Sequence, residues 1–460
     1  MTEFDRVDPF ALNAHDDLRR AARAIFDATL ASMDARAATR RALDFNGGRL
    51  TILDTEFDLN AQPHAIYSIA TGKAAVGMAS AVDEVLGDAL AGGVVSAPPM
   101  GVGLPERWGV FAGGHPLPNE ASLEAARAAF ALLRAADAQA RALVIFLISG
   151  GGSAMLEWPR DEAITLAEMQ EANRALVACG ANINEINSVR RAFSAVKGGG
   201  LGACAGRAAQ ISLIISDTRE DEPYNVASGP TYAFPHEPHE SSEIVKRYRL
   251  DARLPASILR AVNQPLPSPT ETDSALMLRR HHVLLDNERA LVRAAEVAAA
   301  HGFTVEIARD LSEQPVAEGA ALLVSRLFDL RRREGRRPVC LISGGEFSCP
   351  VRGAGVGGRN AETVLRCAFE IEAQAARAPS DATTRVVVFS AGTDGIDGNS
   401  PAAGALGDDT TLARARTLSL DARKFLEASD AHTFFAALGD AVTTGATGTN
   451  IRDLRLLLAR

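Results

Sequence analysis

The stretch ALVIFLISGGGS, residues 142–153, decides the fold class. Its first seven residues are apolar without interruption, which is typical of a strand buried on both faces of a parallel sheet. The glycines at 150–152 predict a tight turn that leads into a helix. Comparable apolar runs alternate with helical patterns along the rest of the chain, at 65–70, 211–215, 282–285, 339–342 and 385–389. This alternation predicts an α/β fold whose parallel sheets are covered by helices.

Two helices have ends that can be read from the sequence. Thr165 and Glu168 form a capping-box pattern, and Gly180 stands where that helix should stop. A second helix is predicted over residues 287–301, with Gly302 at the position after its C-terminus. These signals support the predicted alternation of strands and helices.

Composition excludes several function classes. The 460 residues are 47% hydrophobic and 23% charged, which is a globular balance. A net charge of −9 argues against a nucleic-acid-binding surface, and the apolar run at 142–148 is too short to span a membrane. Five dispersed cysteines and an acidic N-terminus without an apolar segment predict a cytoplasmic protein with reduced thiols.

The domain boundary is predicted from prolines. Pro255, Pro265, Pro267 and Pro269 cluster in one segment, where they would interrupt a helix or a central strand. We therefore expect an N-terminal domain over 1–254, a connection over 255–270 and a C-terminal domain over 271–460. Residues 147–152 (LISGGG) resemble residues 341–346 (LISGGE), which suggests that the two domains use similar turns.

Unusual residues gather directly after the predicted strands. In open α/β sheets, ligands bind beyond the carboxyl ends of the strands, so this placement is the strongest functional signal in the chain. The five turns concerned are at 71–73 (TGK), 149–153 (SGGGS), 216–217 (SD), 344–346 (GGE) and 392–395 (GTDG).

Each turn has a functional and a structural interpretation. Residues Ser149, Gly150, Gly151, Gly152 and Ser153 could hold a phosphate with backbone N–H groups, or could form only a tight turn. Lys73 at a helix N-terminus favours an anion beside it, because a cation alone is disfavoured there.

Three aspartates offer ligands of the kind that Mg²⁺ prefers. Asp217, Asp394 and Asp397 suit Mg²⁺ that is shared with substrate phosphates, or could cap helices and turns instead.

Two further patterns suggest cofactors only weakly. Residues 353–358 (GAGVGG) fit GxGxxG, but no acidic residue follows a second strand at the spacing that dinucleotide binding requires. Arg359 and Asn360 come next, and the guanidinium group would suit a phosphate or a carboxylate. His236 and His239 have HxxH spacing without a nearby third ligand, which makes a metal site there the less favoured interpretation.

Together these motifs resemble those of class II glycerate kinases, the family that ends in a MOFRL domain and is also labelled hydroxypyruvate reductase or tartrate-utilisation protein. The resemblance runs from about residue 18 to the C-terminus. In the first half its motifs are at 72–75, 113–118, 149–156, 187–190, 197–199, 216–217 and 227–231. In the second half they are at 343–346, 357–360, 391–398 and 447–450.

The resemblance implies a fold and a mechanism. The fold would be two unlike α/β/α domains, with a Rossmann-like, mostly parallel sheet in the first and a smaller mixed sheet in the second. The activity would be transfer of a phosphoryl group from ATP to the 2-hydroxyl of D-glycerate, with Mg²⁺, in an inter-domain cleft. Lys73, Asp217 and Arg359 would be catalytic, and Asp394 with Glu346 would hold Mg²⁺. The remaining contacts to the nucleotide would come from the turn at 149–153 and from Lys197, Gly357, Gly358 and Asn360.

The chain departs from the family pattern at five positions, which are Asn119, Ala192, Gly200, Glu220 and Pro401. Ala192 and Gly200 replace a histidine and an arginine near the KGG motif, and the loss of these groups could change acceptor choice. Two other functions stay open, an NAD(P)H-dependent hydroxypyruvate reductase and a non-catalytic metabolite-binding protein. A homo-oligomer is one candidate assembly, and we expect neither a nucleic acid nor a membrane as a partner.

Overall fold

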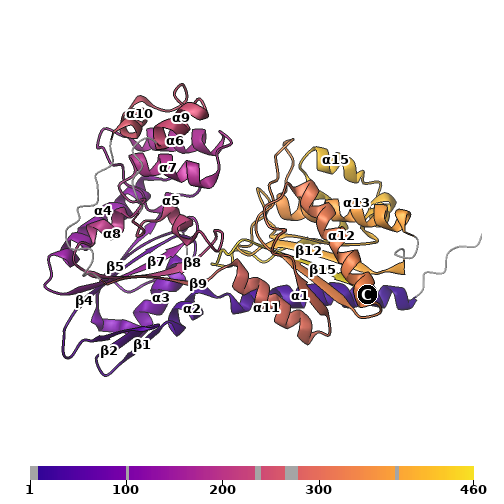
Figure 1. Cartoon of the computed structure of the whole chain (residues 1–460), viewed down its shortest axis with the longest axis horizontal. Helices are drawn as coiled ribbons and strands as arrows, with labels where there is room; N and C mark the ends of the chain where they lie inside the picture. Colours follow the sequence, from indigo (N-terminus) through magenta and orange to yellow (C-terminus); the bar gives the residue numbers. More distant parts are fainter. Residues whose placement is uncertain (1–8, 100–102, 234–239, 265–277, 379–382) are drawn as a thin grey trace, which may run out of the picture. The chain divides into compact units, whose positions relative to one another are not determined.

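A computed structural model describes residues 9–99, 103–233, 240–264, 278–378 and 383–460 of the chain. The chain divides into two compact units (Figure 1). Unit 1 contains Met1–Asp34 and Asp286–Arg460, and unit 2 contains Ala35–Leu285. No helix among these residues is long and apolar enough to cross a membrane.

The main sheet of unit 2 has six strands, and every neighbouring pair is parallel. In spatial order the strands are β6 (Trp108–Ala112), β5 (Leu90–Ala97), β4 (Ala65–Thr71), β7 (Ala142–Ser149), β8 (Ala209–Ile215) and β9 (Arg279–Leu285). All eight residues of β7 are buried, as the unbroken apolar run predicts for a central strand covered on both faces. The Rossmann-like parallel sheet is confirmed.

Helices cover both faces of this sheet (Figure 1). On one face lie α2 (Ala35–Arg41), α3 (Ala75–Leu86) and a small antiparallel sheet of β1 (Leu43–Asn46), β2 (Arg49–Ile52) and β3 (Thr55–Asp58). On the other lie α4 (Glu120–Asp137), α5 (Gly152–Met155) and α8 (Gly200–Cys204). A separate apolar cluster joins α6 (Leu166–Val177), α7 (Ile183–Phe193), α9 (Glu240–Arg247) and α10 (Ala256–Asn263). Short 3-10 helices occupy Gly87–Ala89 (η1) and Pro223–Ser228 (η2).

Unit 1 contains a smaller mixed sheet, as the resemblance implies. Its spatial order is β10 (Thr304–Ile307), β11 (Val339–Ser343), β15 (Asp453–Ala459), β12 (Val386–Gly392), β13 (Gly404–Asp408) and β14 (Ala441–Val442). Only the β10–β11 pair is parallel, and the other four pairs are antiparallel. The helices are α1 (Pro9–Ser32), α11 (Asn287–Ala300), α12 (Val316–Glu334), α13 (Arg359–Arg377), α14 (Thr411–Thr417), α15 (Ala422–Glu427) and α16 (Ala431–Leu438).

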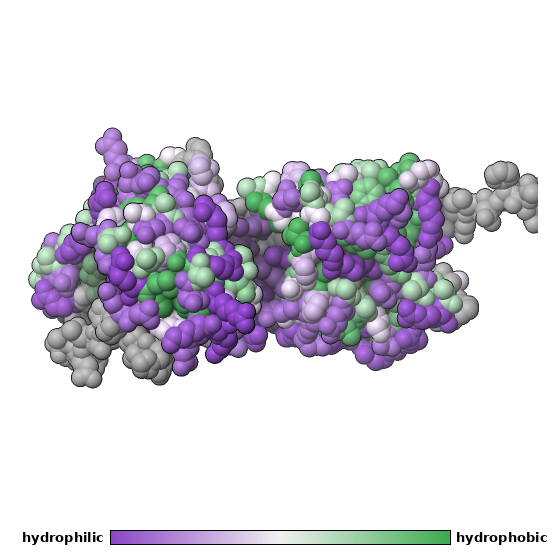
Figure 2. Space-filling model, turned by 90° about the horizontal axis from the view of Figure 1, so that it is seen from above, coloured by the Kyte–Doolittle hydropathy of each residue, from purple (hydrophilic) through white to green (hydrophobic). Residues whose placement is uncertain are grey.

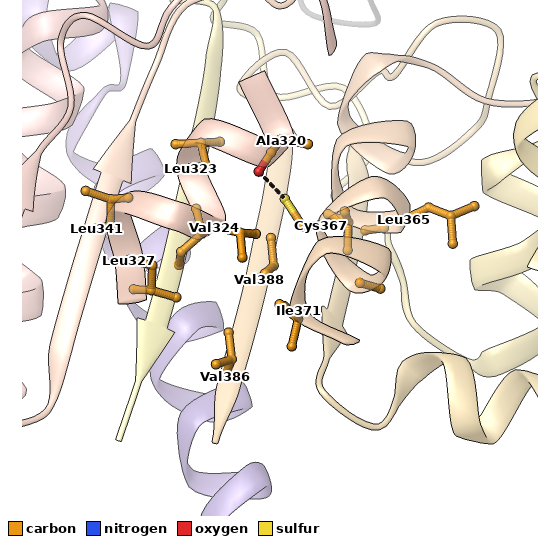
Figure 3. Packing of buried hydrophobic residues seen from close by; sticks show 14 of the residues in the cluster. Ala320, Leu323, Val324, Leu327, Leu341, Leu365, Cys367, Ile371, Val386 and Val388 are labelled. Carbon is orange, nitrogen blue, oxygen red and sulfur yellow. Dashed lines mark hydrogen bonds between the residues drawn. The ribbon is translucent and has the colours of Figure 1, made fainter. Parts of the chain in front are cut away.

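α12 and α13 pack against one face of this sheet through an apolar core. Figure 3 shows Leu323 and Leu327 of α12, Ile371 of α13 and Val388 of β12 in one buried cluster between the helices and the sheet. The Cys367 thiol of α13 donates a weak hydrogen bond across the helix pair to the Ala320 carbonyl, with a sulfur–oxygen distance of 3.8 Å (Figure 3). Each buried leucine contributes about 2 kcal/mol by leaving water, so this core is a main source of the unit's stability.

The opposite face of the same sheet is covered by α11 and by the N-terminal helix α1. Leu18, Ala22, Ile25 and Phe26 are all buried there, and the Phe26 ring lies 4.8 Å from that of Phe389 in β12. These residues recur at helical spacing, so they form one apolar stripe. The chain therefore begins in unit 1, enters unit 2 at Ala35 and returns at Asp286.

This arrangement differs from the predicted domain limits at 254 and 271. Pro255 does not lead into a connection but precedes α10, where its missing N–H costs nothing at a helix start. β9 pairs with β8 and so belongs to the first sheet, although the sequence suggested the second. The other three prolines of the predicted connection lie outside the described residues.

The predicted local signals are confirmed. Thr165 and Glu168 form a reciprocal capping box at the start of α6, and Gly180 beyond its end has a left-handed backbone (φ +84°). α11 begins at Asn287 as predicted, and Gly302 follows it with φ +86°. Figure 2 shows mostly hydrophilic residues on the visible surface of each unit, with hydrophobic residues in scattered patches.

Candidate functional site

The first group of predicted site residues lies at the topological switch point of the unit 2 sheet. From β4 the chain moves outward to β5 and β6 on one side, then returns to β7 and continues to β8 and β9 on the other (Figure 1). Helices that leave adjacent strands in opposite directions open a crevice beyond the carboxyl ends of those strands. Lys73 follows β4 and Gly150 follows β7, so both border this crevice.

The turns after β4 and β7 are locked together by hydrogen bonds. Ser149 Oγ donates to the Thr71 carbonyl at 3.2 Å and accepts from the Ala74 N–H at 3.1 Å. The Lys73 N–H donates to the Gly150 carbonyl at 2.9 Å. Ser149 is buried, and these bonds use its hydroxyl group, so its role is to join the two turns rather than to contact a ligand.

Three polar side chains lie against the glycines of the second turn. A Cβ atom built on Gly150 would overlap the carboxylate oxygen Oδ2 of Asp217. A Cβ atom on Gly151, which has φ +83°, would lie 3.4 Å from Lys73 Cγ and 3.5 Å from His115 Nδ1. A side chain at 150 would collide with the Asp217 carboxylate, and Lys73 and His115 lie beside Gly151, so all three residues lie against one backbone turn.

Ser153 at the end of this turn is tied to a strained segment. Its Oγ lies 2.9 Å from Ser228 Oγ, which in turn donates to Asn187 Oδ1 at 2.9 Å. Ala227 and Ser228 both have positive φ angles, 51° and 61°, a conformation that costs a residue with a side chain on the order of 1 kcal/mol. The surrounding structure holds this strain beside the predicted phosphate turn.

Lys197 differs from its predicted role. Its ammonium forms a buried ion pair with Glu157 and donates to the Ser153 carbonyl at 2.9 Å, and both charged side chains are 1% exposed. Burial lowers the pKa of Lys197, while the Glu157 carboxylate opposes that shift. Lys197 therefore supports the turn through Glu157 and the Ser153 carbonyl, and its contact with a nucleotide stays a prediction.

The second group of predicted residues lies at one edge of the unit 1 sheet. β11 and β12 are both antiparallel to β15, so their carboxyl ends meet the amino end of β15 at the same edge. Glu346 follows β11, Asp394 follows β12, and Asp453 begins β15. Arg359, the first residue of α13, lies among them.

Arg359 is paired with carboxylates of its own unit. Its Nε and Nη2 donate to the two oxygens of Asp453 at 2.6 and 3.0 Å, and Nη2 lies 2.9 Å from Glu346 Oε1. Burial alone would lower the pKa of Arg359, but Asp453 and Glu346 outweigh burial and raise it. The bidentate fork that the sequence predicted for a substrate thus has a partner within the protein.

Asn360 and Gly358 hold the start of α13 in place. Asp397 accepts hydrogen bonds from the Asn360 and Ala361 N–H groups at 2.9 Å each, so a distant loop caps this helix. The Asn360 side chain is buried between Asp397, Asp453 and Ser390, and a Cβ on Gly358 would overlap Asp397. The sequence offered two interpretations of Asp397, a metal ligand and a cap, and in the structure it caps α13.

The GxGxxG match at 353–358 is a packing element. A Cβ on Gly353 or Gly355 would lie 2.6 Å from the Ala428 carbonyl oxygen, and the Gly357 N–H donates to Asn399 Oδ1 at 2.8 Å. The loop follows no strand directly, because β11 ends at Ser343. Close backbone approach explains these glycines without a dinucleotide.

Metal ligation by Glu346 and Asp394 stays a prediction. Within the described ranges no group of three or more His, Cys, Asp or Glu side chains is arranged to hold a metal ion. Burial raises the pKa of Glu346 and Arg359 opposes the shift, while the side chain is still 36% exposed. His236 and His239 fall outside the described residues.

The structure explains three of the five departures from the family pattern. Ala192 is buried in the apolar cluster of α6, α7, α9 and α10, and a Cβ on Gly200 would overlap the Ala195 carbonyl. Asn119 caps α4 and forms a capping box with Ser122, a task that Asn and Asp perform equally well. Glu220 and Pro401 are exposed, and nothing in the structure explains them.

Sequence reasoning missed four residues, which are His115, Glu157, Asp453 and Arg455. His115 belongs to the motif at 113–118, to which no role was given. Its position directly after β6 is the signal that could have identified it. Asp453 and Arg455 occupy alternate positions of a buried apolar strand, where charged residues are rarely found without partners. That anomaly could have identified both from the sequence.

The two family models that match the chain cover much of both halves. Residues 21–263 match the model described as a domain of unknown function, DUF4147, and residues 339–453 match the MOFRL family model.

Curated relatives are similar to this chain over most of its length. The human glycerate kinase is 34% identical over 96% of this chain and 93% of its own length. The D-glycerate 2-kinase of Thermotoga maritima is 31% identical over 85% of this chain and 89% of its own. A protein of Agrobacterium vitis named putative hydroxypyruvate reductase is 36% identical over 85% of this chain and 98% of its own.

Two solved structures are similar over nearly the whole chain. The crystal structure of glycerate kinase from Thermotoga maritima has a TM-score of 0.79 at 28% identity and covers 97% of this chain and 100% of that one. The PH0495 protein of Pyrococcus horikoshii has a TM-score of 0.74 at 27% identity, with 100% of this chain and 99% of that one covered.

Proposed function

The chain belongs to the glycerate kinase family with a C-terminal MOFRL domain, and from this premise we propose that it phosphorylates D-glycerate to 2-phosphoglycerate with ATP and Mg²⁺. The observation that carries the proposal is the convergence of Lys73, His115 and Asp217 on the glycine turn at the switch point of the unit 2 sheet. Phosphoryl transfer depends on positioning the substrates and stabilising charge more than on covalent chemistry from the protein. In this proposal the turn and its side chains do both.

In this mechanism Lys73 neutralises an anionic group of a substrate, and backbone N–H groups of residues 150–153 contact phosphate oxygens. Asp217 lies against Gly150, and in this proposal it orients the acceptor hydroxyl or accepts its proton. A carboxylate and a cation beside the same turn suit this task, because the hydroxyl must lose a proton while negative charge grows on the transferred group.

Unit 1 would contribute Arg359, Glu346 and Asp394. Oxygen ligands are what Mg²⁺ prefers, and it is commonly held by one or two carboxylates together with waters and phosphate oxygens, so the pair of Glu346 and Asp394 fits the ion. When bound, Mg²⁺ neutralises charge on the phosphates. That both groups of residues act on one substrate in an inter-domain cleft stays a prediction.

The reductase alternative is less supported. Relatives carry the name putative hydroxypyruvate reductase, but the loop that formally fits the dinucleotide motif is filled by Ala428, Asp430 and Asn399. A non-catalytic metabolite-binding protein would keep the same turn without turnover.

One experiment separates these functions. Purified protein is incubated with ATP, Mg²⁺ and D-glycerate, and phosphorus NMR follows the products. We expect a 2-phosphoglycerate signal that depends on glycerate and on Mg²⁺. NADH oxidation with hydroxypyruvate in the absence of ATP would replace the proposal with a reductase, and ligand binding without any product would indicate a sensor.

A further inference from the structure

Asp453 is the residue around which the polar groups of unit 1 are organised. It is the first residue of β15, which lies between β11 and β12, so its backbone is fixed by both neighbours. Its side chain is fully buried. A buried carboxylate at the mouth of a proposed active site needs partners, and the nature of those partners shows what it does.

Four hydrogen-bond donors or charges surround the Asp453 carboxylate. Arg359 donates twice, at 2.6 and 3.0 Å, and Asn360 Nδ2 donates to Oδ1 at 3.0 Å. Arg455 Nη1 lies 3.8 Å from Oδ2. Burial would raise the pKa of Asp453, but Arg359 and the hydrogen bonds outweigh burial and lower it, so the carboxylate stays ionised at neutral pH.

Arg455 supports the Asp453 carboxylate from the interior of unit 1. It points to the same face of β15 as Asp453, because side chains two residues apart in a strand share a face. Its guanidinium donates to Ser343 Oγ at 3.2 Å and to the Gly344 carbonyl, and it stacks 3.8 Å above the Phe347 ring. Arg455 is fully buried, so it cannot itself meet a substrate from solvent.

Asn287 holds the backbone at the start of β15, the strand that carries Asp453 and Arg455. Its Nδ2 donates to the carbonyls of Ile451 and Asp453 at 2.7 and 3.1 Å, and its Oδ1 accepts from the Gly345 N–H at 2.9 Å. The turn that carries Glu346 and the start of β15 are thereby joined by a single side chain from α11. Arg359 is only 33% exposed, and its partners come from this rigid frame.

From these contacts we propose that Asp453 is a positioning residue that sets the orientation of the Arg359 guanidinium, with Arg455 and Asn287 as its supports. The Nε and Nη2 edge of Arg359 is directed at Asp453, and Nη2 also lies 2.9 Å from Glu346 Oε1, so Nη1 is the part that can meet an anionic substrate group. The inference rests on the proposed function for its catalytic meaning, but the orientation itself can be measured without turnover.

The test combines kinetics with the NMR signal of the Arg359 Nε–H group in ¹⁵N-labelled, full-length protein. The signal is identified by its absence in Arg359→Lys. Asp453→Asn keeps the shape of the side chain and removes its charge, so we expect the Arg359 signal to shift and to exchange faster with water. We also expect kcat/KM for glycerate to fall about 10- to 100-fold.

Two controls separate positioning from a general loss of stability. Asp408→Asn removes the charge from another buried carboxylate of unit 1, one that pairs with Arg19 and Arg414, and it should lower thermal stability without changing the Arg359 signal or kcat/KM. In an Arg359→Ala background, Asp453→Asn should cause no further loss of activity, because the two residues act as a unit.

The outcomes decide the matter. An unchanged Arg359 signal in Asp453→Asn, or independent and additive losses of activity, would overturn the proposal. If Asp453→Asn does not fold, the wild-type protein provides the test. Exchange of its Arg359 Nε–H proton with water at the rate of an exposed arginine would overturn the proposal, because a fixed bidentate pair slows that exchange. If the wild-type protein transfers no phosphoryl group to glycerate, the proposed function fails while the NMR measurements still judge the positioning role.

Discussion

The buried pair of Lys197 and Glu157 allows a quantitative test of unit 2. Glu157 Oε1 also accepts from Ser194 Oγ at 2.5 Å and from the Trp158 N–H at 3.0 Å, so the carboxylate keeps two hydrogen bonds if the lysine is removed. Breaking a buried pair by removing one partner typically costs 3–5 kcal/mol. Because these two bonds remain, we expect Lys197→Met to cost about 3 kcal/mol, the lower end of that range.

Removing both charges should cost less than removing one. In Lys197→Met combined with Glu157→Gln, no charge is left buried, and the glutamine can still accept from Ser194 Oγ. We expect the double variant to regain about 2 kcal/mol relative to the sum of the two single variants. Arg49→Met is the control for an exposed pair, because Arg49 and Glu56 are 65% and 57% exposed, and it should cost less than about 0.5 kcal/mol.

The assay is urea unfolding followed by tryptophan fluorescence. The chain has two tryptophans, Trp108 and Trp158, and both lie in unit 2, so the signal reports that unit. With a slope of about 3 kcal/mol per molar urea, Lys197→Met should lower the midpoint by roughly 1 M. Strictly additive effects of the two substitutions, or a single-variant shift no larger than that of Arg49→Met, would refute the buried-pair reasoning.

Three further outcomes are expected. Asp217→Asn should lower kcat at least about 100-fold with unchanged thermal unfolding and no recovery in excess Mg²⁺; recovery would make it a metal ligand instead. Arg19→Ala should destabilise unit 1 by about 2 kcal/mol in calorimetry, because Arg19 pairs α1 with the buried Asp408; an unchanged transition would show that α1 is held by apolar contacts alone. Burial raises the pKa of Cys349 and of Cys367 to about 12 from 9.0, so their contribution to stability is complete below pH 9 and is lost as the pH rises toward 12. Rapid alkylation of these thiols by iodoacetamide at pH 8 in folded protein would contradict this.

The sequence by itself determined several central strands, two helices with readable ends and the positions of the chemical groups along the chain. Uninterrupted apolar runs such as 142–148 identify central strands, because a strand covered on both faces has no polar side to display. The capping residues Thr165 and Glu168 act within one helical turn, so their effect is local and visible in sequence. The glycine turn at 149–153 was likewise recognisable as a tight turn at a strand end, whereas its contacts with Lys73 and Asp217 come from the structure.

Tertiary structure alone decided which sheet each element joins. The stripe of Leu18, Ile25 and Phe26 predicts a buried helix face but carries no information about its partner, which proves to be a sheet whose strands begin almost 300 residues later. The domain limits therefore could not be placed correctly from the prolines. Pairing across long sequence separations depends on shape and on the whole core, which no local pattern encodes.

Tertiary structure also decided which charged residues are engaged within the protein. From sequence, Lys197 and Arg359 are both cations beside glycine turns, and nothing separates them from Lys73. In the folded chain, Glu157 pairs with Lys197 and Asp453 pairs with Arg359, each from a distant segment. A charge that is buried away from water must be paired. Burial is a property of the assembled core, so the pairing of Lys197 and Arg359 appears only once the chain has folded.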